Sequence, residues 1–243
     1  MAIALESQSS AFATAVSGTI TWTHTPAATG GTNLVAIVGE TVYDGTDAAR
    51  PLTGVTYGAT AMAKIGSKDQ ANANITTELW YLLNPPGGAQ TILATYTGTV
   101  INRMGGCVML SGISTLTTAA STGTLNTNAP SGTGTSSADN SWAVDVVGSE
   151  PSWTGHTLTA GAGQTRGPFG TIANEAIAMS WEGPQTPAGP IVMSWTIDVN
   201  RDWNLIMGIF SPATATGGAA FNLERLERHY PRGDMRGGMR GAF

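Results

Sequence analysis

Apolar and polar residues alternate along most of this chain with the two-residue period of a β-strand. In residues 19–24 the alternation is complete, because Ile20, Trp22 and His24 fall on one face and three threonines fall on the other. Residues 34–38 form a near-continuous apolar run, which predicts a strand covered on both faces. The same pattern predicts strands at residues 19–24, 33–43, 54–58, 77–83, 90–97, 106–111, 141–147, 176–181, 191–199 and 203–210.

Glycine and proline clusters separate these predicted strands. Residues 84–88 are Asn-Pro-Pro-Gly-Gly, and two prolines cannot enter a central strand of a sheet. Residues 115–139 are rich in Thr, Ser, Gly and Asn, and we expect two short strands at most there, with long loops. About ten or eleven strands without a convincing helix predict an all-β, two-sheet antiparallel sandwich that is jelly-roll-like. An immunoglobulin-like sandwich is the alternative, but it needs only about 100 residues. No internal repeat is evident.

The composition of the chain changes after Ala215. We expect residues 1–215 to form the β-sandwich domain and residues 216–243 to form a Gly/Arg-rich C-terminal tail. Residues 221–230 could form about two helical turns, with Asn222 as N-cap and Pro231 as terminator. The tail from Asn222 onward has five arginines and three acidic residues, a net charge of +2, which leaves −7 for the rest of the chain.

This difference in charge predicts that the tail is an assembly arm, which docks on an acidic surface of a neighbouring subunit. The tail residues expected to contact the partner are Leu223, Arg225, Leu226, Arg228, Tyr230, Arg232, Arg236, Arg240 and Phe243.

Charged residues make up only 11% of the chain, and the lysines are Lys64 and Lys68 alone. A surface of Thr, Ser and Gly is easily desolvated and suits burial against other copies, although a secreted or thermally robust domain would also fit. The net charge of −5 and the lack of a basic cluster in the body argue against a nucleic-acid partner. We expect no membrane insertion and no signal peptide, hence synthesis in a host cytoplasm.

The chain lacks the usual motifs of catalysis and metal binding. The three histidines are far apart in sequence, and Cys107 lies in an apolar run that predicts a buried, inert thiol. Residues 44–47 (Asp-Gly-Thr-Asp) fit an ordinary turn better than a calcium loop, and the Arg-Gly-Asp at 232–234 is too short to be specific. We therefore expect no enzymatic activity, cofactor or metal.

A glycoside hydrolase is the enzyme that this fold class would most readily support, because it needs two carboxylates on one sheet face. Six of the seven tryptophans are expected in or near the core, whereas Trp153 lies in a loop and is a candidate exposed anchor for a partner or a sugar. The carboxylates considered are Glu78, Asp145, Glu175, Glu182 and Asp198.

Several short segments, taken in their order along the chain, resemble those of a group of phage and metagenomic structural proteins. The segments are Ile20-Thr21-Trp22-Thr23-His24, Gly54-Val55-Thr56-Tyr57-Gly58, Glu78-Leu79-Trp80-Tyr81-Leu82, Asn84-Pro85-Pro86-Gly87, Ala160-Gly161-Ala162-Gly163-Gln164 and Ser194-Trp195. The resemblance covers residues 18–212 and rests on strand and turn signatures, so no functional residue is carried over. It implies a β-sandwich displayed on a virion or cell surface.

From these observations we expect a bacteriophage virion structural protein, either a capsid decoration, a head-fibre component or a tail component. Its partners would be copies of itself and other virion proteins. The alternative is a carbohydrate-binding or adhesin module that binds host surface glycans.

Overall fold

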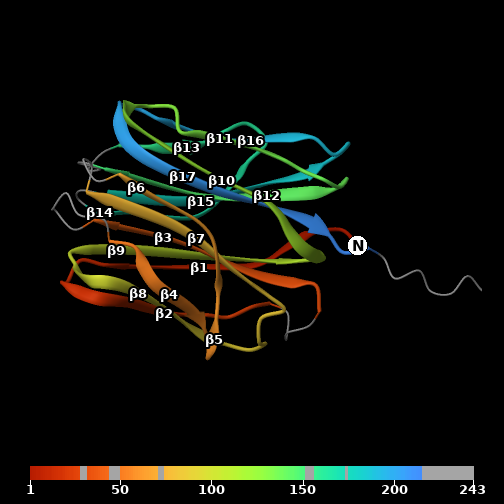
Figure 1. Ribbon diagram of the computed structural model, residues 1–243, viewed down its shortest axis with the longest axis horizontal. Helices are drawn as coiled ribbons and strands as arrows, with labels where there is room; N and C mark the ends of the chain where they lie inside the picture. Colours follow the sequence, from red (N-terminus) through yellow and green to blue (C-terminus); the bar gives the residue numbers. More distant parts are fainter. Residues whose placement is uncertain (28–31, 44–49, 71–73, 151–155, 173–174, 215–243) are drawn as a thin grey trace, which may run out of the picture.

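The computed structural model describes residues 1–27, 32–43, 50–70, 74–150, 156–172 and 175–214. These residues form seventeen β-strands and no helix, which confirms the all-β prediction (Figure 1). The strands are β1 (Ala4–Ala13), β2 (Ser17–His24), β3 (Leu34–Tyr43), β4 (Leu52–Tyr57), β5 (Thr60–Ala61), β6 (Ala63–Gln70), β7 (Ile75–Leu83), β8 (Gln90–Val100), β9 (Asn102–Ser111), β10 (Ile113–Thr127), β11 (Ser131–Thr135), β12 (Ser141–Glu150), β13 (Leu158–Ala160), β14 (Thr165–Ile172), β15 (Glu175–Gln185), β16 (Pro190–Ile197) and β17 (Arg201–Pro212).

The strands form four antiparallel sheets stacked in four layers, rather than the two sheets expected (Figure 1). The two inner sheets have the strand orders β1-β9-β3-β7-β6 and β10-β17-β12-β15-β14. The two outer sheets have the orders β2-β8-β4-β5 and β11-β16-β13. Four layers enclose three apolar cores, one at each junction between successive sheets.

Burial explains why the inner strands were predictable. The central strands β3, β9, β12, β15 and β17 are covered by a sheet on each face, so most of their residues are buried. The core between the inner sheets includes Ile37, Leu79, Val144 and Phe210, all nearly or wholly inaccessible to solvent. The apolar run at residues 34–38 is therefore covered on both faces, as predicted.

The strand order of the first half of the chain is repeated in the second half. The inner sheet β1-β9-β3-β7-β6 corresponds strand for strand to β10-β17-β12-β15-β14, and the outer β2-β8-β4 corresponds to β11-β16-β13. Each half is therefore a two-sheet sandwich, and the two sandwiches pack through their five-stranded sheets. This repeat was not evident from the residue pattern, so the structure corrects that interpretation.

Local irregularities recur at equivalent positions in the two halves. Asn33 and Asn140 both adopt a positive φ immediately before β3 and β12. The pairing register shifts directly after Lys64 on β6 and directly after Arg166 on β14. Because such bulges depend on the local register, their recurrence identifies equivalent residues independently of side-chain similarity.

The two halves are related by an approximate two-fold axis that passes between β3 and β12. Counting from the asparagine before each strand aligns Gly39 with Val146, and Thr41 with Gly148. A Cβ atom on Gly39 would lie 2.8 Å from Cγ2 of Val146, and one on Gly148 would meet Thr41 Oγ1. Residues that contact their own equivalents lie on the axis, as in an isologous dimer. A glycine in each pair lets the two strands approach closely.

Contacts away from the axis are reciprocal. The edge strand β1 of one inner sheet packs on the edge strand β14 of the other, and the equivalent strands β10 and β6 pack together. Phe12 lies over Gly170 in the first contact, whereas Lys68 lies over Gly123 in the second. Phe12 and Gly123 are equivalent, as are Gly170 and Lys68. The large side chain therefore comes from β1 in the first contact, whereas in the second contact it comes from β6, the equivalent of β14.

The jelly-roll assignment stays a prediction. Each half alternates between its two sheets as a jelly roll does, but after β5 the chain crosses over and β6 pairs with β7. The stretch at residues 115–139 also differs from expectation, since it contains most of the fifteen-residue strand β10 followed by β11. Its threonines and serines are half exposed because β10 is an edge strand.

Candidate functional site

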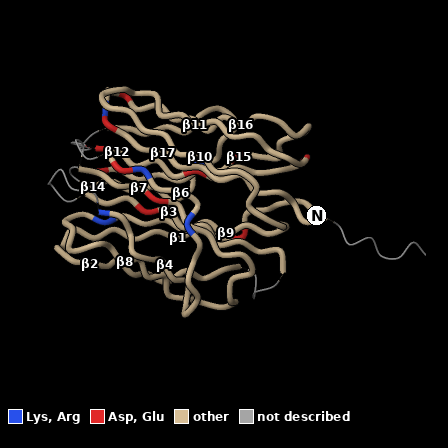
Figure 2. Tube along the Cα trace, in the orientation of Figure 1, with Lys and Arg blue, Asp and Glu red and all other residues tan. Residues whose placement is uncertain are grey.

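Charge is distributed unevenly among the four layers. The seven strands of the two outer sheets, all of whose residues are described, contain no Asp, Glu, Lys or Arg. In Figure 2 the charged positions lie on the inner sheets and in connecting segments. The strands of the two outer sheets thus carry no charge, although the whole chain carries a net charge of −5.

The solvent side of the first outer sheet is a regular array of hydroxyl groups around one aliphatic side chain. Thr21 of β2 lies directly opposite Leu93 of β8, and Leu93 is 36% exposed. Ile20 and His24 point the other way, into the core, as the alternation predicted. We call this surface the first outer face; it consists of Thr19, Thr21, Thr23, Thr91, Leu93, Thr95 and Thr56.

The second outer sheet has the same arrangement on the opposite side of the molecule. Thr133 of β11 lies directly opposite Val192 of β16, and Val192 is 52% exposed. Met193 and Trp195 point inward and are buried. We call this surface the second outer face; it consists of Ser131, Thr133, Thr135, Pro190, Val192, Ser194, Thr196 and Thr159.

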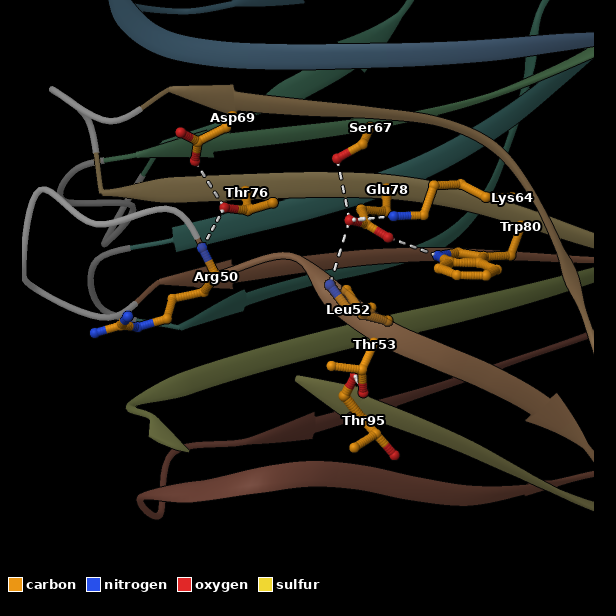
Figure 3. A network of polar contacts seen from close by, with 10 residues as sticks. All are labelled: Arg50, Leu52, Thr53, Lys64, Ser67, Asp69, Thr76, Glu78, Trp80 and Thr95. Carbon is orange, nitrogen blue, oxygen red and sulfur yellow. Dashed lines mark hydrogen bonds and ion pairs between the residues drawn. The ribbon is translucent and has the colours of Figure 1, made fainter. Parts of the chain in front are cut away.

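Among the candidate carboxylates, Glu78 on β7 is wholly buried and has a complete set of donors (Figure 3). Its Oε1 atom accepts from Lys64 Nζ at 2.9 Å, from Ser67 Oγ at 3.0 Å and from the Leu52 amide at 3.3 Å. Its Oε2 atom accepts from Trp80 Nε1 at 2.9 Å. These bonds join β7 to β6 and to the outer strand β4, so the geometry is that of a structural clamp.

Glu40 lies beside Glu78 and is stabilised differently. Its Oε2 atom accepts a hydrogen bond of 2.7 Å from the Tyr96 hydroxyl, while Oε1 has no partner among the described residues. Burial raises the pKa of Glu40 well above its usual value, and the nearby Glu78 charge adds to this rise. Glu40 is therefore best accommodated in its protonated form.

Asp145 on β12 lies in the other half, between the inner sheet and the second outer sheet. Its Oδ1 atom accepts from Ser180 Oγ at 2.6 Å and from the Ser180 amide at 3.0 Å, and its Oδ2 atom accepts from Trp195 Nε1 at 2.7 Å. Burial raises the pKa of Asp145 to about 7, against the lowering effect of these donors. Glu78 and Asp145 therefore serve different cores and do not form a catalytic pair on one open face.

The other three carboxylates occupy three separate environments. Glu175 is wholly buried at the start of β15, and burial raises its pKa well above the usual value. Glu182 borders a small hollow of about 210 Å³ with Gly163, and burial raises its pKa. Asp198 lies at the surface, 3.3 Å from Nδ1 of His156. Glu175 interacts electrostatically with Glu40 and Glu150, which are not among the five candidates. Glu78, Asp145 and Glu175 are all wholly buried, so these three do not lie on an open sheet face as the hydrolase alternative requires.

His24 and Cys107 are core residues, as the sequence indicated. His24 Nδ1 lies 2.8 Å from Ser9 Oγ and its Nε2 lies 2.9 Å from Ser7 Oγ. Burial lowers the pKa of His24 to about 4, so the ring is neutral near pH 7. Burial also raises the pKa of the Cys107 thiol, which disfavours the reactive thiolate. The described residues contain no group of three or more His, Cys, Asp or Glu that could hold a metal.

A polar cleft of about 400 Å³ lies between parts of the edge strands β1 and β14, beside the Phe12–Gly170 contact. Gln8, Ser9 and Ser10 line one side, and Arg166 and Phe169 line the other. The guanidinium carbon of Arg166 lies 4.7 Å from the centre of the Phe169 ring. The cleft combines hydroxyl, amide and aromatic groups, a chemistry that sequence reasoning did not identify because the two strands are far apart in the chain.

Several predicted sites lie outside the described residues. They are Trp153, the Asp-Gly-Thr-Asp turn at residues 44–47, and the tail from residue 216 with all of its proposed contact residues from Leu223 to Phe243. In the described part of the chain, no helix has the length and hydrophobicity to cross a membrane.

Comparisons of the chain with protein-family models, with curated proteins and with solved structures find no match.

Proposed function

We propose that this chain is a structural protein of a virion, which works by packing against copies of itself and against neighbouring subunits rather than by catalysis. The observation that carries this proposal is the absence of charge from both outer faces. A monomeric protein gains solubility from surface charge, whereas a neutral hydroxyl-rich surface costs less free energy to desolvate and bury. The candidate carboxylates Glu78 and Asp145 are fully engaged in holding sheets together.

The basic tail supplies a second contact in this proposal. Its charge of +2 complements the −7 of the remaining chain, so the tail of one subunit would be attracted to the body of the next. Residues 225–240 carry the five arginines responsible.

The test compares the mass of the full chain with that of a chain ending at Ala215, by light scattering over a range of concentrations. We expect the full chain to form larger species and the shortened chain to associate more weakly. Virion location is tested by labelling purified particles with an antibody against the chain. Monomers at all concentrations, together with unlabelled particles, would overturn the proposal.

A carbohydrate-binding module is the second candidate, and the cleft between β1 and β14 is the observation that favours it. Its hydroxyl and amide groups, beside the Arg166–Phe169 pair, are suited to hydrogen bonding and stacking with a sugar. Titration with glycans, followed by tryptophan fluorescence, should show saturable binding that is lost in Arg166→Ala if this candidate is correct.

A further inference from the structure

The two outer faces lie on opposite sides of the four-layer stack (Figure 1). From this arrangement we infer that copies of the chain stack on one another through these faces, which adds molecules along the axis perpendicular to the sheets. The inference rests on the proposed assembly function and names its surface, its partner and its geometry. The partner is a second copy of this chain.

The absence of charge selects a second copy as the occupant. A partner of opposite charge would gain nothing from the outer faces, because their strands carry no charged side chain. A second copy, in contrast, is not repelled there, although each copy carries a net charge of −5. The charges of both copies would remain at the sides of the stack and in the inner layers.

The two faces also match each other in chemistry. Each presents one exposed aliphatic side chain, Leu93 or Val192, opposite a threonine of the neighbouring strand. Hydroxyl groups of Thr and Ser surround both positions and can donate to and accept from one another. Sheets already pack face to face three times within the molecule. Stacking of copies would continue that packing, with sheets about 10 Å apart.

The placement of the faces determines the form of the assembly. A protein with one self-complementary face closes into a dimer, but a protein with two such faces on opposite sides adds copies without closing. Either face can meet either face, because both have the same pattern. The expected product is therefore a linear stack.

The size of each outer face determines the protein concentration at which copies should stack. The three main strands of the first outer sheet have 8, 11 and 6 residues, and those of the second have 5, 8 and 3. Each face therefore covers at most roughly 25 Å by 15 Å, which is less than the roughly 800 Å² per partner of a standard stable interface. Each contact is then weak by itself. Stacking should grow with concentration, and the mean mass should rise steadily rather than reach a plateau at a dimer.

The test places a charge on each face of the full chain and measures mass by sedimentation velocity at several concentrations. The variants are Leu93→Lys, Val192→Lys and the double variant. The matched controls are Leu5→Lys and Val16→Lys, which make the same changes at residues that are 39% and 67% exposed and lie off the outer sheets. Circular dichroism and thermal unfolding establish that each variant is folded.

We expect the parent and the controls to form stacks. Each single variant should form smaller species because one face is blocked, and the double variant should form only species that are held together by the tail. Stacking of the double variant like the parent would overturn the inference. If that stacking is lost on removal of the tail, the proposed assembly function still stands and uses the tail alone.

A parent that stays monomeric at every concentration would contradict both the stacking and self-assembly. If the parent does not self-associate but binds crystalline or repetitive glycan surfaces, and the double variant does not bind them, the outer faces bind carbohydrate instead.

Discussion

Glu40 and Glu78 lie directly opposite each other on β3 and β7, and both carboxyl groups are wholly buried. Two adjacent carboxylates in one apolar layer cannot both be charged at low cost. Glu78 accepts from the ammonium group of Lys64 and from three further donors, whereas the Tyr96 hydroxyl is the only donor to Glu40 among the described residues. The pair therefore combines one ion-paired group and one group with a raised pKa.

Replacing Lys64 by Met should destabilise the protein, because Glu78 would lose the only cation within ion-pair distance among the described residues. Lys64 is partly exposed, so water offsets some of the loss, and we expect a decrease of about 1–3 kcal/mol in the free energy of unfolding. Urea unfolding measures this. Lys68→Met on the same strand is the control and should change stability by less than about 0.5 kcal/mol. Equal losses in the two variants would show that the ion pair is not responsible.

Glu40→Gln should flatten the dependence of stability on pH. The folded protein retains a proton on Glu40, while the unfolded chain releases it above pH about 4.3. Stability must therefore fall as the pH rises above that value. The variant lacks this linkage, so its stability should fall less between pH 4.5 and pH 8. Tyr96→Phe should act in the opposite direction, because it removes the donor that favours the ionised form. Parallel profiles for all three proteins would refute the assignment.

Trp195→Phe should make the protein more sensitive to high pH. The pKa of Asp145 is raised to about 7 in the folded state, so stability is lost as the pH rises from about 4 towards 7. Without the Trp195 N–H the pKa rises further and the loss should continue above pH 7, by about 1–3 kcal/mol relative to the parent at pH 9. Chemical unfolding at pH 5, 7 and 9 measures the effect.

The control for that experiment is Trp203→Phe. Trp203 belongs to the same apolar core, and its indole N–H bonds the Thr127 hydroxyl at 2.7 Å rather than a carboxylate. This variant should lose stability by a similar amount at every pH. A pH-dependent loss in both variants would point away from Asp145.

Gly39→Ala should weaken the contact between the two sandwiches. The new methyl group would lie 2.8 Å from Val146 Cγ2 and 3.1 Å from Met179 Sδ, both in a packed core. Such overpacking costs about 1–3 kcal/mol. Gly54→Ala provides the comparison, because a Cβ there meets nothing within 4 Å. Thermal unfolding of the two variants should therefore differ clearly, and similar melting temperatures would argue against a close approach at the two-fold axis.

The sequence predicted strands that bury at least one complete face. All ten predicted strands are present: β3, β9 and β17 are visible as apolar runs, whereas the outer strand β2 is visible as an alternation of apolar and polar residues. The edge strands β1, β6 and β14 were missed, since polar residues such as Ser7, Ser9 and Lys68 interrupt their alternation. Edge strands gain stability from backbone hydrogen bonds on one side. Because these bonds do not require particular side chains, the residue pattern does not reveal such strands.

The repeat and the outer faces were hidden for a different reason. Equivalent positions hold unlike residues, such as Gly39 and Val146, so register rather than identity relates the two halves. The alternation at residues 19–24 did separate the threonines, which lie on the first outer face, from Ile20 and His24, which lie in the core. The neutrality of a whole layer could not be predicted, because it depends on which distant strands, β2 and β8 for example, share a sheet.

The approximate two-fold axis also bears on the origin of the chain. The two sandwiches are joined by the single residue Gly112, whose positive φ and close approach to the Ala2 carbonyl leave no room for a side chain. An ancestral gene for one sandwich that formed a homodimer, duplicated and fused in frame, would produce this arrangement. Fusion frees the two copies from having to mutate together. One half could then evolve an ion pair at Glu78 and the other a carboxyl–indole contact at Asp145, within the same ancestral architecture.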